Sequence, residues 1–425
     1  MHFHAVFLGA GPAGMGPILK SLKNGSFSNL VNKGIAIVEQ SQYLVRGSIT
    51  GYKINSDTLV DAFLECLDGC TLDFFDASEL SDAIKKLKYF SGGSIPLKDL
   101  DIFYLKLGQI IRKLITGFAN CKVFLNTRAE KIIINHEGDY ELILNNGEKI
   151  ITKNLVLAVG GRPYPSLGDN GFLQGSLQED RYKHKTWHSD ELLSGKIDYE
   201  ATSILRINPN VLILGGSHSA FSSADYILKK FSDVYFIKNS IRIYCKKPPK
   251  IYFQSKEEAM MYGYRDFDDN DFCPVTGRLF RLAGLRMDGR RLYMRMIGML
   301  NGETENRVSV NCDIDLQDEI EYEYSSAGLV ILALGYRFNM IPIFDSQLNP
   351  VKLNGQKRGE WVNSECQVLD CESIQIPGLF AIGLASGYTP KGVQGGEPSF
   401  TGQTSGIWFY QNIVGEIILA KLLSQ

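Results

Sequence analysis

Short apolar runs that end on glycine recur along this chain and determine its predicted organisation. The first, at residues 5–8, leads into the motif Gly9-x-Gly11-x-x-Gly14, after which apolar residues take up helical spacing. A second apolar run, at residues 34–38, follows that helix and ends at Glu39. A strand, a glycine turn, a helix and a second strand together predict a βαβ unit with parallel strands.

The period of the apolar positions then changes along residues 60–160. Helical spacing predicts a short helix over residues 59–64, capped by Ser56 or Asp57, and a longer core-facing helix over residues 100–118. Four short strand-like runs follow, and Asn145-Asn146-Gly147 marks a hairpin turn between the last two. We therefore expect a small antiparallel meander over residues 121–152, and then a strand over residues 154–160 that returns to the first sheet.

A second strand–glycine–helix unit begins at Val211. Its strand, residues 211–214, leads into Gly215-x-Ser217-x-x-Ala220, a version of the first motif with small residues at two glycine positions. The pattern predicts its helix over residues 221–231 and its second strand over residues 234–237. Later apolar runs predict buried strands at residues 326–336 and 376–383, with a last helix that starts near residues 399–402.

These elements predict an α/β fold with two Rossmann-like dinucleotide-binding domains, the second inserted into the first. The first domain would comprise residues 1–165 and 326–425, and the second residues 166–325. A stretch of mixed charge at about residues 243–310 fits neither pattern. We interpret it as an insertion that walls a substrate pocket or makes a subunit contact.

The first glycine motif has the chemistry of a dinucleotide site. Its first glycine permits a tight turn, the second lets the backbone approach a pyrophosphate, and the third lets the helix pack closely on the sheet. The helix N-terminus attracts the phosphates, and an acidic residue after the second strand binds ribose hydroxyls. The candidate residues of this site are Gly9, Gly11, Pro12, Ala13, Gly14, Glu39 and Gln40.

The second glycine motif differs because no acidic residue follows its predicted second strand. Lys238 and Arg242 stand there instead, and such cations attract a 2′-phosphate, which favours NADPH over NADH. The alternative is a solvated loop with two basic residues. The candidate residues are Gly215, Ser217, His218, Ser219, Lys238 and Arg242, with Gly160, Gly335, Tyr336 and Gly383 at the ends of the returning strands.

Composition excludes several classes of partner. The 425 residues are 44% hydrophobic and 22% charged with a net charge of −2, so nothing favours nucleic acid or an anionic membrane. No apolar run approaches the roughly 20 residues that span a bilayer, and the N-terminus has no basic segment of a secretion signal. The eight cysteines include no CxxC pair. We therefore expect a cytoplasmic protein that acts on a small molecule and could form a homo-oligomer.

Two dinucleotide sites in one chain suit electron transfer from a nicotinamide to a flavin. At this point the chain resembles the class B flavin-dependent monooxygenases, which comprise flavin-containing, Baeyer–Villiger and N-hydroxylating enzymes. The resemblance rests on the Gly9–Gly14 motif with Glu39, the segment around His188, the Gly215–Ala220 motif, and Ala333-Leu334-Gly335-Tyr336. The family motif F-x-G-x-x-x-H reads here as Tyr182-x-His184-x-x-x-His188.

The resemblance implies that FAD occupies the first site and NADPH the second. Reduced FAD would activate O2 as a C4a-(hydro)peroxide and oxygenate a small molecule, and we favour N-hydroxylation of an amine. Asn55 would donate a hydrogen bond near flavin N5, with Lys53 as its neighbour, and His188 would orient the linker or serve a purely structural role.

Three alternatives remain open at this point. A thioredoxin-reductase-like enzyme would need a redox-active cysteine pair, but Cys66-x3-Cys70 has the wrong spacing for CxxC. An FAD-dependent NADPH oxidoreductase could act without inserting oxygen. A flavin-fold protein could also serve only as a binding partner, because a fold does not fix the chemistry.

Overall fold

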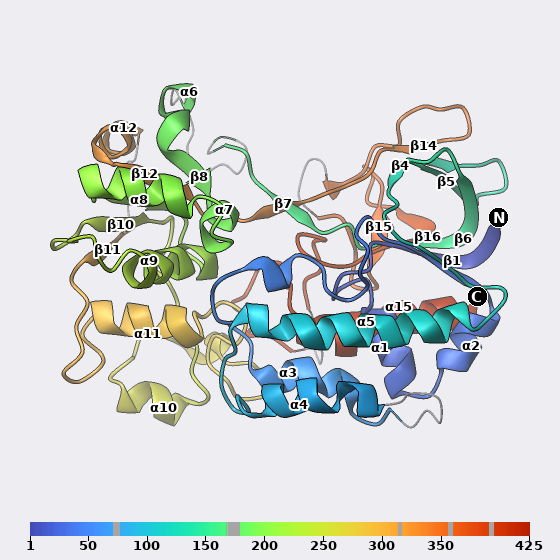
Figure 1. Ribbon diagram of the computed structural model, residues 1–425, viewed down its shortest axis with the longest axis horizontal. Coiled ribbons are helices and arrows are strands. Elements are labelled where there is room, and N and C mark those ends of the chain that lie inside the picture. The colour runs from blue at the N-terminus through green and yellow to red at the C-terminus, as the bar shows by residue number, and fades with distance from the viewer. Residues whose placement is uncertain (71–76, 167, 169–178, 313–316, 356–359, 391–394) are drawn as a thin grey trace.

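The computed structural model describes residues 1–70, 77–166, 168, 179–312, 317–355, 360–390 and 395–425, and the chain forms two lobes (Figure 1). The first lobe is built on a mixed sheet and the second on a parallel sheet. The chain crosses between them through an antiparallel ribbon of β7 (Gly161–Pro163) and β13 (Tyr336–Phe338). The sheet of the second lobe therefore lies, in sequence, between two parts of the first.

The first lobe has a parallel core with the strand order β3-β2-β1-β6-β16. These strands are β1 (His2–Leu8), β2 (Ile35–Val38), β3 (Lys122–Phe124), β6 (Lys149–Leu157) and β16 (Gln375–Ala381). The predicted meander is confirmed only in part, because β3 pairs with β2 in the parallel core. The two strands expected at residues 148–160 form one long strand, whose first half pairs with β5 and whose second half pairs with β16.

The remaining strands extend this sheet at its edges. β4 and β5 form the antiparallel hairpin that continues into β6, β14 pairs with β4, and β15 pairs with β16. Their bounds are β4 (Ala129–Ile134), β5 (Tyr140–Leu144), β14 (Ile343–Phe344) and β15 (Gln367–Leu369).

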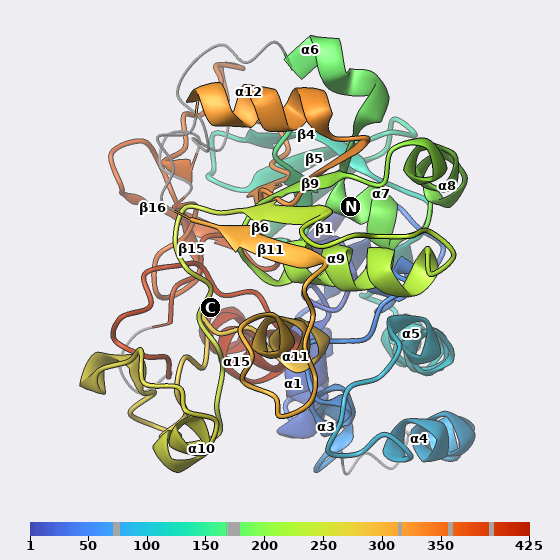
Figure 2. The same cartoon turned by 90° about the vertical axis from the view of Figure 1, so that its left-hand side faces the viewer.

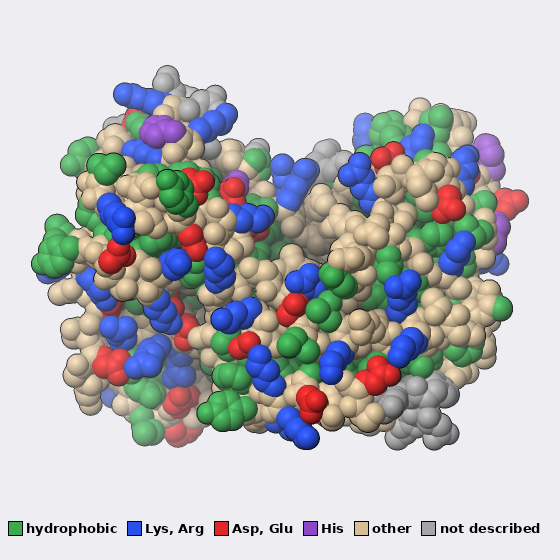
Figure 3. All heavy atoms as spheres, viewed as in Figure 1, with side chains coloured by type: hydrophobic (Ala, Val, Ile, Leu, Met, Phe, Trp, Pro, Cys, Tyr) green, Lys and Arg blue, Asp and Glu red, His purple; other side chains and the backbone are tan. Residues whose placement is uncertain are grey.

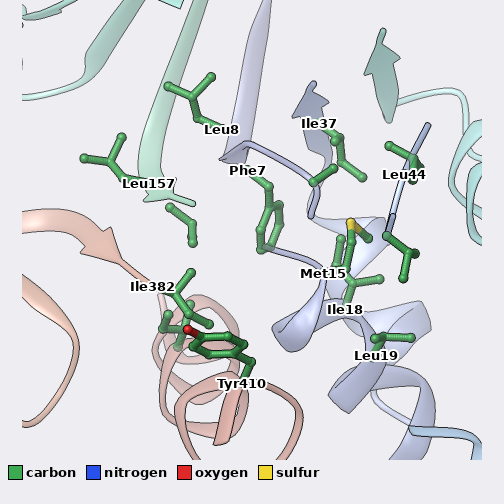
Figure 4. Close-up of a cluster of buried hydrophobic side chains, with 14 of the residues drawn as sticks. Phe7, Leu8, Met15, Ile18, Leu19, Ile37, Leu44, Leu157, Ile382 and Tyr410 are labelled. Atoms are coloured by element: carbon green, nitrogen blue, oxygen red, sulfur yellow. The ribbon is translucent and has the colours of Figure 1, made fainter. Parts of the chain in front are cut away.

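Helices cover the parallel core, and Figure 4 shows the apolar cluster between them. Met15 and Ile18 at the start of α1 lie beneath Phe7 and Ile37 of the sheet, with Tyr410 beside them, and all of these side chains are buried. The helices are α1 (Gly16–Lys23), α2 (Phe27–Asn32), α3 (Val60–Leu64), α4 (Ser81–Lys88), α5 (Asp101–Thr116), α14 (Ile407–Phe409) and α15 (Gly415–Ser424).

Two helices of the first lobe begin at other residues than expected. α5 agrees closely with the prediction, but α3 begins at Val60 and receives no side-chain cap. The last helical segment begins at Ile407 rather than near residues 399–402. It is continued by a π-helical turn, Tyr410–Val414, which passes over Gly16 of α1.

The second lobe is a parallel sheet with the order β11-β10-β9-β12-β8 and helices on both faces (Figure 2). Alternate residues of β9 point to opposite faces, so that Val211 and Ile213 pack with α9 while Leu212 and Leu214 pack with α12. The strands are β8 (Thr186–His188), β9 (Val211–Leu214), β10 (Ile241–Tyr244), β11 (Val308–Asn311) and β12 (Leu329–Leu332). The helices are α6 (Glu179–Tyr182), α7 (Ser189–Leu193), α8 (Asp198–Ile207), α9 (His218–Lys230) and α12 (Gln317–Ser326).

The predicted insertion lies between β10 and β11, within the limits expected. It carries α10 (Lys256–Met261) and α11 (Met287–Met296) and has a small apolar core of its own around Phe253 and Phe280. The surface is hollowed between the two lobes (Figure 3). Among the described residues, no helix is both long and apolar enough to cross a membrane.

Candidate functional site

The first glycine loop joins β1 to α1 and has the construction of a nucleotide site. Gly9 has a φ of +95°, and a Cβ atom there would lie 2.8 Å from the carbonyl carbon of Ala158. A Cβ atom on Gly14 would meet the carbonyl oxygen of Gly9 and lie 2.8 Å from the Ala158 Cβ. Gly11 differs, since its Cβ would lie 3.5 Å from the nearest atom, the Cα of Gly47. The fold therefore requires Gly9 and Gly14, and it leaves room beside Gly11 for a ligand to approach the backbone.

Two other parts of the first lobe meet this loop. Gly383, just after β16, has a φ of +115°, and its Cβ would lie 3.2 Å from the Cβ of Ala13. The ring of Pro12 lies against Gly47. The structure thus brings Gly383 and the end of the returning strand next to the first glycine loop.

Glu39 lies where a ribose-binding carboxylate is expected. It is 8% exposed, and its carboxylate accepts hydrogen bonds from the backbone N–H groups of Ala10 at 2.7 Å and Ser41 at 2.8 Å. Gln40, beside it, is exposed. These contacts hold the carboxylate next to the glycine loop.

The second glycine loop repeats this construction in the second lobe. Gly215 has a φ of +133°, and its Cβ would lie 2.8 Å from the carbonyl carbon of Ala333, as that of Gly9 would from Ala158. Both alanines begin an Ala-x-Gly sequence after a strand, and Gly160 and Gly335 adopt φ values of +71° and +83°. Gly160 and Gly335 are candidate residues from the sequence, but no local pattern shows that the alanine of each repeat packs against a glycine loop.

The strand predicted at residues 234–237 is wrong, and this changes the assignment of the cations. The second strand of the unit is β10, and the N–H of Gly215 bonds to the carbonyl of Tyr244 as that of Gly9 bonds to Val38. The position equivalent to Glu39 is therefore Cys245, and the exposed residues Lys246 and Lys247 follow it.

Lys238 and Arg242 do not lie at this loop. Lys238 comes before β10, at the opposite end of the strand. Arg242 lies on the face of the sheet that α12 covers, where its Nε is 2.6 Å from the Glu323 carboxylate of that helix. Both are corrected as candidates for binding a 2′-phosphate, because the basic residues that follow β10 are Lys246 and Lys247.

His218 begins α9 directly after the candidate residue Ser217, and its ring holds the insertion against the second glycine loop. The Nε2 atom accepts a hydrogen bond of 3.2 Å from the backbone N–H of Arg286 and lies 3.9 Å from the Asp57 carboxylate of the first lobe. Burial lowers the pKa of His218, which keeps Nε2 unprotonated as an acceptor. The structure thus gives the His218 side chain a contact of its own, besides its place in the second glycine loop. Ser219, on the first turn, accepts the Ser223 hydroxyl at its carbonyl.

The segment that carries Lys53 and Asn55 bridges the two lobes. The Lys53 ammonium pairs with Asp198 at 3.0 Å, and the Asn55 amide donates to Asp288 of α11 at 2.9 Å. Lys53 is therefore corrected from a catalytic neighbour to an interlobe contact. Asn55 lies at the junction of the lobes, and its role beside a flavin remains a prediction.

Tyr336 forms a second junction. Its hydroxyl donates to Asp190 on α7, and a side-chain hydrogen bond links it to Tyr52 of the first lobe. Burial, reinforced by Tyr52 and Asp190, raises the pKa of Tyr336 well above that of an exposed tyrosine. The tyrosine therefore stays a neutral hydrogen-bond donor where the ribbon enters the second lobe. His188 supports the same region, since its backbone N–H donates to Glu191 at the start of α7.

The cysteine pair of the disulfide-reductase alternative lies away from the loop. Cys66 is buried beyond α3, and the neighbouring Glu65 pairs with Lys23, at the end of α1 opposite the glycine loop. Burial raises the pKa of both Cys66 and Cys70. A thiolate at this position is disfavoured, which argues against a redox role for the pair.

The chain was compared with protein families, with curated proteins and with solved structures. No protein-family model matches the chain. A curated relative, the CMP-5'-(3-aminopropyl)phosphonate hydroxylase of Streptomyces rubellomurinus, is 27% identical over 439 residues, which cover 100% of this chain and 98% of the relative.

Solved structures show the fold. The ornithine N-hydroxylase of Kutzneria sp. 744, with reduced FAD, NADP+ and L-ornithine, has a TM-score of 0.55 at 13% identity and covers 99% of both chains. The FAD-bound cadaverine monooxygenase of Erwinia amylovora has a TM-score of 0.59 at 12% identity, covering 100% of this chain and 95% of that one. The L-lysine 6-monooxygenase of Pseudomonas syringae has a TM-score of 0.55 at 13% identity and covers 99% of both chains. The chain thus has the fold of the flavin-dependent N-hydroxylating monooxygenases, in agreement with the resemblance drawn from its motifs.

Proposed function

We propose that this protein is an NADPH-dependent flavoprotein monooxygenase that hydroxylates the nitrogen of a small amine. The observation that carries the proposal is the pair of glycine loops built in the same way, with an acidic residue after the second strand of one unit and lysines after that of the other. FAD is assigned to the lobe of residues 1–165 and 326–425, and NADPH to residues 166–325.

The residues of the first loop fit FAD. The backbone at Gly11 and the start of α1 would hold the pyrophosphate, since the N–H groups there point out of the helix. The remaining lone pairs of the Glu39 carboxylate would bind ribose hydroxyls. Gly383 would bring the returning chain to the same loop.

The residues of the second loop fit NADPH. Gly215 and Ser217 would contact its pyrophosphate, and Lys246 and Lys247 would pair with a 2′-phosphate. A carboxylate at the position of Cys245 would repel that phosphate, and none is present there.

FAD, when bound, supplies the redox chemistry: it takes a hydride from NADPH and uses O2 to place one oxygen atom on the substrate, with the other leaving as water. The protein would bind the two cofactors, one in each lobe, and orient them toward each other. The bridge from Asn55 to Asp288 and the pairing of Tyr336 with Asp190 keep the lobes together for this transfer.

The activities of the similar proteins support an amine substrate. The structural neighbours act on ornithine, lysine and cadaverine, and the curated relative acts on an aminopropylphosphonate attached to CMP. We therefore propose a primary amine as substrate, with O2 as co-substrate. None of the eight cysteines, all of which the structure describes, forms a disulfide, and this supports the cytoplasm as the proposed location.

A substrate panel tests this proposal against an NADPH oxidoreductase that inserts no oxygen. Purified protein is loaded with FAD and supplied with NADPH, O2 and one of a series of amines, including aminoalkylphosphonates with and without a nucleotide, or a sulfide or ketone. NADPH consumption and hydrogen peroxide release are measured together. Our proposal predicts that one amine raises NADPH consumption without a matching release of peroxide. Peroxide equal to NADPH with every compound would contradict it.

A further inference from the structure

Two cysteine side chains meet at the ends of neighbouring strands in the second lobe. β10 and β11 pair in register from Ile241 with Val308 to Tyr244 with Asn311, and Cys245 and Cys312 are the next residue of each strand. The N–H of Cys245 continues the ladder with a 3.0 Å bond to the carbonyl of Asn311, and the two Sγ atoms are 2.8 Å apart. Neighbouring strands lie about 4.8 Å apart, inside the range of about 4.4–6.8 Å that a disulfide requires between Cα atoms.

This pair lies directly against the second glycine loop. A Cβ atom on Gly216 would be 2.5 Å from the Cβ of Cys245, so the two residues are in close contact. Cys245 also occupies the position that Glu39 has beside the first loop. Because tightly packed neighbours transmit displacements, a shift of Cys245 would move the backbone that is proposed to hold the pyrophosphate of NADPH.

The two thiols differ in access. Cys312 is partly exposed and lines a surface cavity of about 580 Å³ between β11 and the end of α11, together with Tyr293 and Val310. Cys245 is 2% exposed and lies behind it. A small oxidant can therefore reach Cys312 first, and Cys245 is placed to attack the oxidised sulfur.

We propose that Cys245 and Cys312 form a reversible disulfide that weakens nicotinamide nucleotide binding; the binding effect rests on the proposed function. With hydrogen peroxide as oxidant, the Cys312 sulfur attacks one oxygen, the O–O bond breaks, and a sulfenic acid and water are formed. The Cys245 sulfur then attacks the Cys312 sulfur, and the hydroxyl leaves as a second water. In total, two thiols and one peroxide give one disulfide and two waters. A dithiol reductant returns two electrons and two protons and restores both thiols.

Peptide mass spectrometry and nucleotide binding test the inference without relying on turnover. The protein is treated with hydrogen peroxide, then with an alkylating agent, and NADP+ affinity is measured by calorimetry before oxidation, after oxidation and after reduction with dithiothreitol. We expect a peptide pair linked through Cys245 and Cys312 and about tenfold weaker NADP+ binding, which dithiothreitol reverses. Cys312→Ser should abolish both effects, whereas Cys371→Ser, at an exposed cysteine outside the second lobe, should retain them.

Each contrary result has a definite meaning. If no linked pair forms, or if it forms and NADP+ affinity is unchanged, the inference is overturned. If the pair forms and weakens NADP+ binding but no amine is hydroxylated, the inference stands and the proposed function fails. Reduced protein that binds no NADP+ would contradict both.

Discussion

Substitution of Gly11 and Gly14 by alanine separates cofactor binding from folding in the first glycine loop. At Gly14 the new Cβ would meet the backbone oxygen of Gly9 and the side chain of Ala158, whereas at Gly11 it would lie 3.5 Å from its nearest neighbour. Forcing an extra methyl group into a packed interior, as at Gly14, costs about 1–3 kcal/mol. We therefore expect Gly14→Ala to lower the free energy of unfolding of the FAD-free protein by about 2 kcal/mol, and Gly11→Ala to leave it nearly unchanged.

The order reverses for the cofactor. A methyl group on Gly11 occupies the space through which a pyrophosphate would approach the backbone, so FAD affinity should fall by about tenfold or more, equivalent to at least 1.4 kcal/mol. Gly93→Ala is the matched control, because its Cβ would make only an ordinary 3.4 Å contact and the residue lies beyond α4.

Urea unfolding of the FAD-free variants and fluorescence titration with FAD measure the two effects. If Gly11→Ala binds FAD as tightly as the Gly93→Ala control, the pyrophosphate does not pass beside Gly11 and the assignment of this loop is refuted. If Gly14→Ala is as stable as the control, the packing argument for the third glycine is refuted.

Substitutions at three further places test other parts of the site. Replacing Lys246 and Lys247 by serine should raise the KM for NADPH by about tenfold through the loss of charged hydrogen bonds, and it should leave the KM for NADH unchanged. Lys238→Ser should change neither KM. Steady-state kinetics with both nucleotides measures these values, and an unchanged KM for NADPH in the double variant would contradict the role of the two lysines. Burial lowers the pKa of His218 in the folded state, so the unfolded state binds more protons as pH falls below about 6.5 and the free energy of unfolding should decline there. His218→Gln should flatten that part of a profile of stability against pH. An unchanged profile would contradict the role of a neutral, buried His218 ring. Asn55→Ala removes a bond between the lobes, so it should slow hydride transfer from NADPH in rapid mixing without changing FAD affinity; an unaltered rate would exclude this role.

The local parts of the fold could be predicted from the sequence. Turns with positive φ and close backbone contacts require glycine, as at Gly9, Gly14 and Gly215. Because this requirement is local, a short glycine motif in the sequence predicts it. Glu39 could be predicted because it directly follows a short, fully apolar strand. The nested order of the two sheets followed from the repeated strand–glycine–helix pattern.

The second strand of the second unit was predicted at the wrong place because an apolar segment just before it, residues 234–237, has the composition of a strand. Tyr235 and Ile237 look like strand residues, yet they are 83% and 58% exposed in a loop. The true strand β10 contains Arg242, whose charge is neutralised by Glu323 on a helix 81 residues later in the chain, a pairing that no local pattern reveals. The error carried directly into the choice of cations for the 2′-phosphate.

Contacts between the lobes were beyond local patterns for the same reason. Lys53 pairs with Asp198, 145 residues away, and Asn55 bonds to Asp288 in the insertion, 233 residues away. Spacing along the chain carries no signal for such pairs, so Lys53 was placed with the reacting groups instead of with the interface.

Isotope labelling of the product tests the central claim most directly. FAD-loaded protein is given NADPH, the amine selected by the substrate panel and 18O2, and the product is analysed by mass spectrometry. The account predicts a hydroxylamine that carries one 18O atom, formed in proportion to the NADPH consumed. An amine recovered unchanged while NADPH is oxidised, or a hydroxylamine whose oxygen comes from water, would contradict it.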